Sequence, residues 1–304
     1  MKQISQYKLI LFTAFLFAIF YNFSFFKNIL ITYPNEGLNI IYISSTFILL
    51  VSFIVFLFTL LSSKYTTKPL LIITLVVSAF TAYFMDTYHI VIDDSMIRNT
   101  LQTNLSESSD LFTPKLIVYI LILAIAPSYF IFKTKIKYKS FKEEFLKKLK
   151  ILFLSLLIIL IILFSFSKFY TSFFREHKSL RFHINPIYWI YSIGNYVNKT
   201  LTSGSIVVKE TGKDAIVKVD ISEKTEIVIM VVGEAARADR FSLNGYKKET
   251  NPLLKKEEIT NFPNMYSCGT STAESVPCMF SIFGKADYDY KKGISTENIL
   301  DVLK

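Results

Sequence analysis

Five long apolar runs constrain most strongly what this chain can fold into. A helix needs about 20 mostly apolar residues to cross the roughly 30 Å hydrocarbon layer of a bilayer. Runs of this kind cover residues 8–26, 39–62, 70–85, 116–132 and 151–169. The sequence therefore predicts a multi-pass α-helical membrane domain over residues 1–170, with five transmembrane helices.

The composition agrees with a membrane protein. Of the 304 residues, 52% are hydrophobic and 19% are charged, whereas average soluble chains contain about 25% charged residues. A net charge of +10 in a soluble chain would suggest nucleic acid as a partner, but eight lysines against two glutamates put +6 of it into residues 133–150. Because that stretch lies between two apolar runs, we interpret it as a membrane orientation signal and expect no nucleic-acid partner.

Charged residues in the loops predict the orientation, since Lys and Arg accumulate on the cytoplasmic side. Lys2, the loop with Lys64 and Lys68, and the stretch 133–150 are basic, whereas the loop 86–115 is acidic. We therefore expect a cytoplasmic N-terminus. Everything after about residue 170 is expected outside, in the periplasm of a cell with two membranes.

The acidic loop contains an amphipathic segment, residues 95–108. An apolar stripe lies opposite a polar stripe, because the two are offset by about 200° on a helix. The polar stripe consists of Asn99, Thr103 and Glu107. We expect a short helix at the membrane surface, whose polar face either is solvated or meets a polar lipid headgroup, with the Glu107 carboxylate suited to an ammonium.

After the last run, residues 171–225 predict an interfacial helix and a bridge into an exterior domain. Basic residues precede the aromatic side chains Tyr188, Trp189 and Tyr191, and aromatic residues of this kind collect at membrane interfaces. From residue 198 onward the chain becomes polar.

Residues 226–232 are continuously apolar and mostly β-branched, which is typical of a buried parallel strand. The run ends at Gly233 and Glu234. Ligands bind beyond the carboxyl ends of such strands, so Glu234 is a candidate ligand or base. An ordinary loop carboxylate fits the same pattern.

Cys268 and Cys278 are the two cysteines of the chain. Both lie on the expected oxidising side of the membrane, which favours a disulfide between them. Four hydroxyl residues lie in the enclosed loop: Thr270, Ser271, Thr272 and Ser275. The bridge either holds one of these hydroxyls in place or serves only as a structural staple.

Several segments of the chain resemble the lipid A phosphoethanolamine transferases. These are Gly-Glu-x-Ala-Arg at 233–237, Phe-Ser-Leu-Asn-Gly-Tyr at 241–246, Asn-Phe-Pro-Asn at 261–264, and the run from Cys268 to Ser281. The resemblance implies an inner-membrane enzyme whose five helices precede a periplasmic α/β domain of the sulfatase and alkaline phosphatase type, here begun by residues 226–304.

The resemblance also implies roles for individual residues. Thr272 would be the nucleophile and, with Glu234, a ligand of Zn²⁺. Thr272 would attack the donor phosphatidylethanolamine, and a phosphate of the acceptor lipid A would then take the phosphoethanolamine group from it. The polar stripe of residues 99, 103 and 107 would help to seat the donor.

Two features depart from the family pattern. Ala235 stands where the family usually has a threonine, and the three histidines, His89, His177 and His183, all precede Glu234. The family's remaining zinc ligands lie far downstream, and the final segment from Ser295 predicts a helix without a terminator. We therefore expect a truncated or partial sequence that is inactive alone.

Other classes remain open from the residues alone. A membrane phosphoglycerol transferase or a sulfatase-like hydrolase would use the same chemistry on another group. A five-span anchor or sensor would need no chemistry. A transporter is disfavoured, because its pathway normally requires charged residues within the spans, and the apolar runs hold few.

Overall fold

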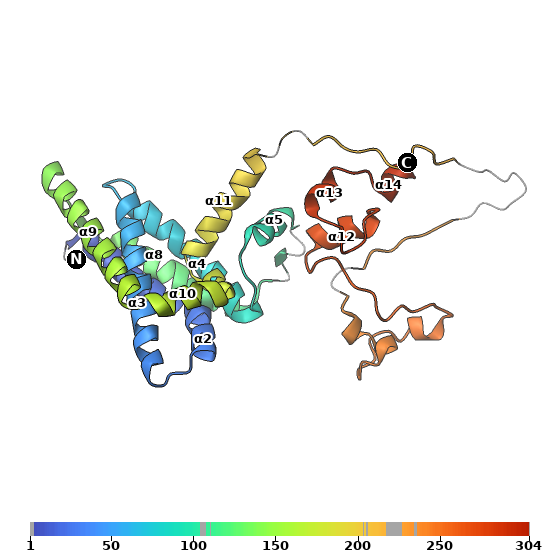
Figure 1. Cartoon of the computed structure of the whole chain (residues 1–304), viewed down its shortest axis with the longest axis horizontal. Coiled ribbons are helices and arrows are strands. Elements are labelled where there is room, and N and C mark those ends of the chain that lie inside the picture. Colours follow the sequence, from blue (N-terminus) through green and yellow to red (C-terminus); the bar gives the residue numbers. More distant parts are fainter. Residues whose placement is uncertain are drawn as a thin grey trace, which may run out of the picture. The chain divides into compact units, whose positions relative to one another are not determined.

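The computed structural model describes residues 3–103, 108–109, 111–202, 204, 206–216, 227–233 and 236–303. The chain divides into two compact units, Met1–Thr200 and Leu201–Lys304. Figure 1 shows long helices in the first unit and short helices joined by extended loops in the second.

The first unit contains the membrane-spanning helices. Four are long and apolar enough to cross a bilayer: α3 (Leu38–Leu61), α4 (Thr67–Tyr88), Pro114–Lys133 and α9 (Phe141–Ser165). The third of these is built from α7 (Pro114–Tyr119), the π-helical turn η2 (Ile120–Ile125) and α8 (Ala126–Lys133). These four confirm the predicted runs at 39–62, 70–85, 116–132 and 151–169.

The first predicted span is broken. It consists of α1 (Gln6–Leu16), the π-helical turn η1 (Phe17–Tyr21) and α2 (Phe23–Thr32), with a bend of 58° between Gln6–Tyr21 and Phe23–Thr32. Asn22 lies at the bend and is buried. Its Nδ2 donates hydrogen bonds to the carbonyl of Phe17 at 2.9 Å and to that of Asn185 at 2.7 Å, so a polar side chain satisfies backbone groups that the helix leaves open.

Asn185 completes a polar network inside this apolar unit. Its backbone N–H donates to Asn22 Oδ1 at 2.9 Å, and its Nδ2 donates to the Ser78 carbonyl at 3.0 Å and to Thr81 Oγ1 at 2.9 Å. Trp189 Nε1 donates to Ser78 Oγ at 3.0 Å. The network joins the break at Asn22, helix α4 and the segment from Asn185 to Trp189, and it gives these donors partners where water is absent.

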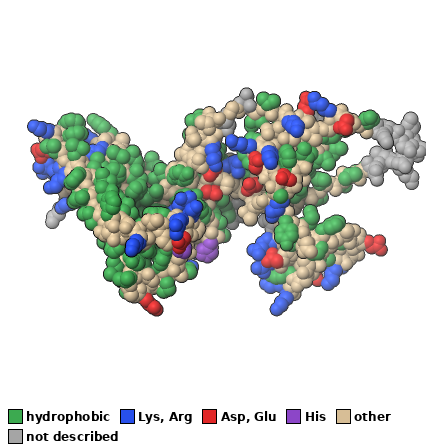
Figure 2. Space-filling model, in the orientation of Figure 1, with side chains coloured by type: hydrophobic (Ala, Val, Ile, Leu, Met, Phe, Trp, Pro, Cys, Tyr) green, Lys and Arg blue, Asp and Glu red, His purple; other side chains and the backbone are tan. Residues whose placement is uncertain are grey.

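The core of the first unit is apolar, and so is its outer surface. Phe17, Phe58 and Leu71 are fully buried, whereas Phe153 and Phe164 on α9 are 68% and 77% exposed. Figure 2 shows hydrophobic side chains over the outside of these helices. Such a surface is expected where lipid replaces water.

A short parallel pairing ties the N-terminus to the lysine-rich stretch. Strand β1 (Ile4–Ser5) pairs with β2 (Ile136–Lys137), with Ile4 opposite Ile136. The Tyr7 hydroxyl donates to the Glu144 carbonyl at 2.9 Å. The start of α1 is thereby held against the start of α9.

The remaining helices of this unit belong to the segments predicted outside the membrane. They are α5 (Asp94–Gln102), α10 (Ser167–Glu176), the 3₁₀ segment η3 (Lys178–His183) and α11 (Ile187–Thr202). α5 covers most of the predicted helix 95–108, of which residues 104–107 lie outside the described residues. Thr103 has an extended backbone and closes α5 by donating its N–H to the Asn99 carbonyl at 2.9 Å.

Within its described residues, the second unit contains short 3₁₀ turns and three short helices. The turns are η4 (Ala238–Arg240), η5 (Ser242–Asn244) and η6 (Leu254–Lys256), and the helices are α12 (Thr272–Phe280), α13 (Tyr290–Ile294) and α14 (Ile299–Val302). The predicted helix from Ser295 begins later, because Asn298 is the N-cap of α14. The Asn298 side chain accepts from the Leu300 N–H, and Asp301 completes a capping box.

The predicted buried strand at 226–232 is not formed over its described part, residues 227–232. These residues have no regular secondary structure and are exposed, with Val228 and Val231 each 85% exposed. A strand is stabilised by the ladder of a neighbouring strand and by cover on its faces. Among the described residues of this unit, the strand-type pairing is a single bridge between Lys209 and Thr296.

Candidate functional site

Thr272 is the first residue of α12, and its side chain is exposed. Ser271 is the N-cap residue, and its carbonyl accepts the Ser275 N–H at 2.9 Å and the Glu274 N–H at 3.1 Å. The N-terminus of a helix presents N–H groups and the positive end of the helix dipole. A negatively charged phosphoryl group next to Thr272 is therefore favoured.

The disulfide between Cys268 and Cys278 is formed, as predicted. It joins the loop before α12 to the second turn of that helix, with the two Cα atoms 6.3 Å apart, and Cys278 is buried. Gly269 packs closely on Glu274: a Cβ atom at position 269 would lie 2.8 Å from Glu274 Oε2. The bridge and this close approach together hold the loop that leads into Thr272.

The expected metal partner of Thr272 cannot be placed beside it, because Glu234 and Ala235 lie outside the described residues. Within the described part of the chain, no three His, Cys, Asp or Glu side chains converge on a common point. The three histidines all belong to the first unit. The donor set of the described residues therefore does not fit a closed zinc site, which needs three or four protein ligands.

Two residues of the predicted polar stripe lie at the C-terminal end of α5. Asn99 lies in the last turns of α5, Thr103 follows its end, and the Thr103 hydroxyl donates to the Asn99 backbone carbonyl at 2.7 Å. Both residues are half-buried. Glu107 lies outside the described residues. A role of the stripe toward a lipid stays a prediction.

Sequence reasoning missed the residues that hold α5 in position. Asp94, at the start of α5, accepts a hydrogen bond from Asn195 Nδ2 at 3.1 Å and pairs with Lys199 Nζ at 2.5 Å. Burial alone would raise the pKa of Asp94, but the hydrogen bond and positive charge of Lys199 outweigh it and hold that pKa below its usual value. Asn195 and Lys199 are four residues apart in α11, and this spacing was the available signal.

His183 ends η3 and is half-buried. Burial lowers the pKa of its imidazole; the nearby Asp86 carboxylate opposes this, and His89 adds to it. Its Nδ1 is buried and lacks a hydrogen-bond partner within the described part of the chain. The neutral imidazole is therefore the favoured form here.

Comparison with known families covers both units. Residues 49–201 match the family model described as phosphoethanolamine transferase EptA/EptB, and residues 226–304 match the sulfatase model. The second match confirms the predicted start of a sulfatase-like domain.

Individual relatives agree with these matches. The chain is 40% identical to phosphatidylethanolamine transferase Mcr-1 of Escherichia coli over 99% of this chain and 57% of that protein. It is 33% identical to phosphoethanolamine transferase EptA of E. coli K12 over 97% of this chain and 54% of that protein. The chain thus spans about half the length of these relatives.

A solved structure has the same fold. It is the integral membrane lipooligosaccharide phosphoethanolamine transferase A (EptA) from Neisseria meningitidis, with a TM-score of 0.87 and 32% sequence identity. The match covers 99% of this chain and 57% of that one.

Proposed function

This chain belongs to the phosphoethanolamine transferase EptA/EptB family, and on that basis we propose that the whole protein transfers phosphoethanolamine from phosphatidylethanolamine to lipid A or a similar surface acceptor. The observation that carries the proposal is the place of Thr272. Thr272 is an exposed residue at the start of α12, within the loop that the Cys268–Cys278 bridge closes.

The reaction has two steps. In the first, Thr272 Oγ1 attacks the phosphorus of phosphatidylethanolamine, the bond from phosphorus to the glycerol oxygen breaks, and diacylglycerol leaves with the proton that Thr272 loses. A phosphoethanolamine ester of Thr272 remains. In the second step, a phosphate oxygen of lipid A attacks that phosphorus, the bond between the phosphorus and Thr272 Oγ1 breaks, and Thr272 Oγ1 takes up the proton that the attacking phosphate gives up. The N-terminal end of α12 stabilises the negative phosphoryl oxygens in both steps.

We assign Zn²⁺ to the whole protein, with the Glu234 carboxylate and the Thr272 hydroxyl among its ligands. A bound zinc ion lowers the pKa of a coordinated oxygen and neutralises charge on a phosphoryl group. The other ligands of such a site are not among the residues that the structure describes.

The donor lipid is proposed to bind at α5. The Asn99 amide can hydrogen-bond its phosphate, and the Glu107 carboxylate complements its ammonium group. The Thr103 hydroxyl donates its proton to the Asn99 carbonyl, so its oxygen can accept from the ammonium.

This assignment requires a defined orientation. We propose an inner-membrane protein with a cytoplasmic N-terminus and a periplasmic catalytic domain, since the lysine-rich stretch 133–150 lies at the opposite end of α9 from the segments that lead to the second unit.

Lipid A mass spectrometry tests the function directly. Cells that express the whole protein are expected to contain lipid A with added phosphoethanolamine, and Thr272→Ala is expected to abolish it. Thr270→Ala, in the same loop, is the matched control and should retain the modification. A phosphoglycerol adduct, or unmodified lipid A at normal protein levels, would contradict the proposal.

A further inference from the structure

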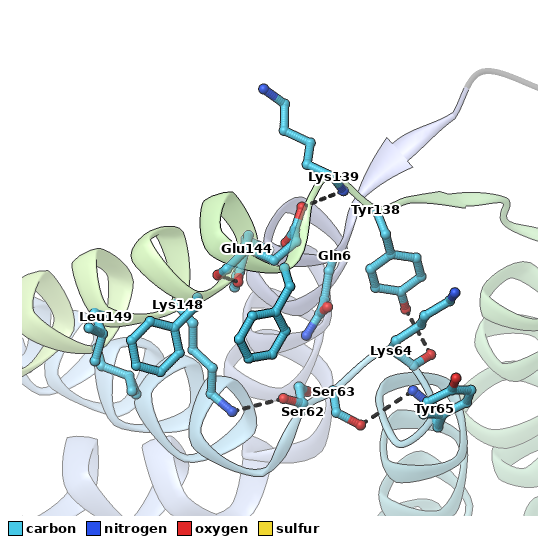
Figure 3. Close-up of a pocket in the computed structure, with 14 residues that line it drawn as sticks. Gln6, Ser62, Ser63, Lys64, Tyr65, Tyr138, Lys139, Glu144, Lys148 and Leu149 are labelled. Carbon is cyan, nitrogen blue, oxygen red and sulfur yellow. Dashed lines mark hydrogen bonds between the residues drawn. The ribbon is translucent and has the colours of Figure 1, made fainter.

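A cavity of about 700 Å³ lies at the end of the first unit that holds the N-terminus. Three segments line it: the start of α1, the loop between α3 and α4, and the chain from Tyr138 into α9. Figure 3 shows these segments around the labelled side chains. Ligand sites for small molecules have volumes of about 300–1,000 Å³, so this cavity is large enough for part of a lipid.

One wall of the cavity is apolar and continues along a membrane span. Phe145, Leu149 and Leu152 line it from α9, and their spacing puts them on one face of that helix. Phe145 and Leu149 are each about half exposed. This wall is suited to an acyl chain.

The opposite end of the cavity is polar and basic. Lys148 Nζ points toward the loop between α3 and α4 and donates to the Leu60 and Ser62 carbonyls, each at 2.9 Å. An ammonium has three N–H donors, so one can still serve a ligand. Lys64 lines the same end, where the Tyr138 hydroxyl donates to its carbonyl at 3.1 Å.

Two buried polar side chains lie at this end. Ser62 is 1% exposed, and its hydroxyl has no hydrogen-bond partner within the described part of the chain. Gln6 is 5% exposed, and its amide points into the middle of the cavity (Figure 3). A buried polar group that lacks a partner is costly. Both groups can donate to an oxygen of a ligand that enters the cavity.

The net charge around the cavity selects the kind of lipid. Among its lining residues are three lysines and the single acidic residue Glu144, whose Oε1 accepts the Lys139 N–H at 3.0 Å. The Lys139 side chain points away from the cavity (Figure 3) and pairs with Glu143 at 2.7 Å. Since the surrounding stretch 133–150 is strongly basic, a headgroup with an ammonium of its own is disfavoured.

We propose that this cavity binds an anionic phospholipid of the cytoplasmic leaflet, such as phosphatidylglycerol. Its phosphate lies between Lys64 and Lys148 and accepts hydrogen bonds from Gln6 and Ser62. Its acyl chain follows the apolar face of α9. The site is distinct from the donor site proposed at α5, and it does not depend on transferase activity.

Native mass spectrometry of the chain purified in detergent tests the proposal, with phosphatidylglycerol, phosphatidylethanolamine and phosphatidylcholine offered at equal concentrations. Phosphatidylglycerol is expected to bind with one-to-one stoichiometry and in preference to the other two. Lys64→Gln/Lys148→Gln is expected to weaken this binding at least about tenfold, because each lysine near an anionic lipid contributes to its binding.

The matched control is Lys142→Gln/Lys147→Gln, which removes the same charge from two residues that do not line the cavity. It should bind phosphatidylglycerol like the parent. Leu149→Trp, which fills the apolar end, should weaken binding without changing the charge. Equal weakening by the two double variants, or equal binding of all three lipids, would overturn the proposal. Thermal unfolding in detergent checks that each variant is folded.

Discussion

Lys199 Nζ on α11 lies 2.5 Å from Asp94 Oδ2 at the start of α5, and Asn195 on the same face of α11 donates to the other oxygen of that carboxylate. α11 therefore fixes the first turn of the helix that carries Asn99 and leads into Thr103. A contact between residues that are 105 positions apart in the chain thereby positions the proposed donor site.

Asp94→Asn should impair donor binding more than it impairs folding. Exposed ion pairs contribute at most about 1 kcal/mol, so the midpoint of thermal unfolding should change little. If the same energy is lost from donor binding, the KM for phosphatidylethanolamine of the whole protein should rise about fivefold, with kcat nearly unchanged. Lys199→Gln should act in the same direction, whereas Lys178→Gln, a nearby basic residue, should not. A KM unaffected in both Asp94 and Lys199 variants would contradict this role.

Asn22→Ala should destabilise the first unit strongly. The substitution removes the hydrogen bonds to Phe17 and Asn185 and leaves the buried Asn185 N–H without its acceptor. We expect a loss of about 2–3 kcal/mol in the free energy of unfolding, measured by thermal or denaturant unfolding in detergent.

Asn39→Ala serves as its control, because the Asn39 amide donates to the Pro34 carbonyl at an exposed position. Its effect should stay within about 0.5 kcal/mol. Equal effects of the two variants would show that the bend at Asn22 does not depend on its side chain.

His183 predicts a pH dependence of stability. Burial lowers the pKa of its imidazole in the folded protein below the ordinary value of 6.5. As the pH falls through 6.5, the unfolded chain takes up a proton that the folded protein does not, so the free energy of unfolding decreases until the folded pKa is reached. The unfolding midpoint, followed from pH 8 to pH 5, should therefore fall.

His183→Gln should flatten that part of the profile, whereas His177→Gln should leave its slope as in the parent. If the unfolding midpoint of the His183 variant changed with pH as in the parent, the pH dependence would come from other titratable groups.

Cys268→Ala/Cys278→Ala should loosen the loop before α12. The bridge spans a sequence separation of 10 residues, and closing a loop of this size is worth about 3 kcal/mol in the chain-entropy model. In the whole protein we expect a lower midpoint of thermal unfolding and reduced transfer, and reductant should have the same effect on the parent but none on the variant. Full activity of the variant would show that transfer does not require the disulfide.

The spans could be predicted from the sequence because a bilayer dictates both the length and the hydropathy of a crossing helix. The break at Asn22 could not be predicted, because the Asn22 amide donates a hydrogen bond to the carbonyl of Asn185, which lies 163 residues away in the chain. The run at 226–232 has strand propensity, but a strand also needs neighbours, and propensity alone does not supply them. The start of α14 was readable, because Asn298 and Asp301 form a capping box at local spacing, but the choice of Ser295 as the cap overlooked it.

Part of the candidate site could also be predicted from the sequence. The disulfide followed from the two cysteines and their expected compartment. The choice of Thr272 among the four hydroxyl residues of the loop rested on the resemblance to the family. Each of the four side chains carries a hydroxyl that could act as a nucleophile, and the sequence alone does not separate them. The link from Asp94 to Lys199 was missed, since it joins two helices that are far apart in the sequence.

Tandem mass spectrometry of the whole protein, after incubation with phosphatidylethanolamine in the absence of an acceptor, tests directly whether Thr272 is the nucleophile. We expect one phosphoethanolamine group on the Thr272 oxygen, which is lost on addition of lipid A and is absent in Thr272→Ala. A phosphoethanolamine group on Thr270 or Ser275 instead, or continued transfer by Thr272→Ala, would contradict this expectation.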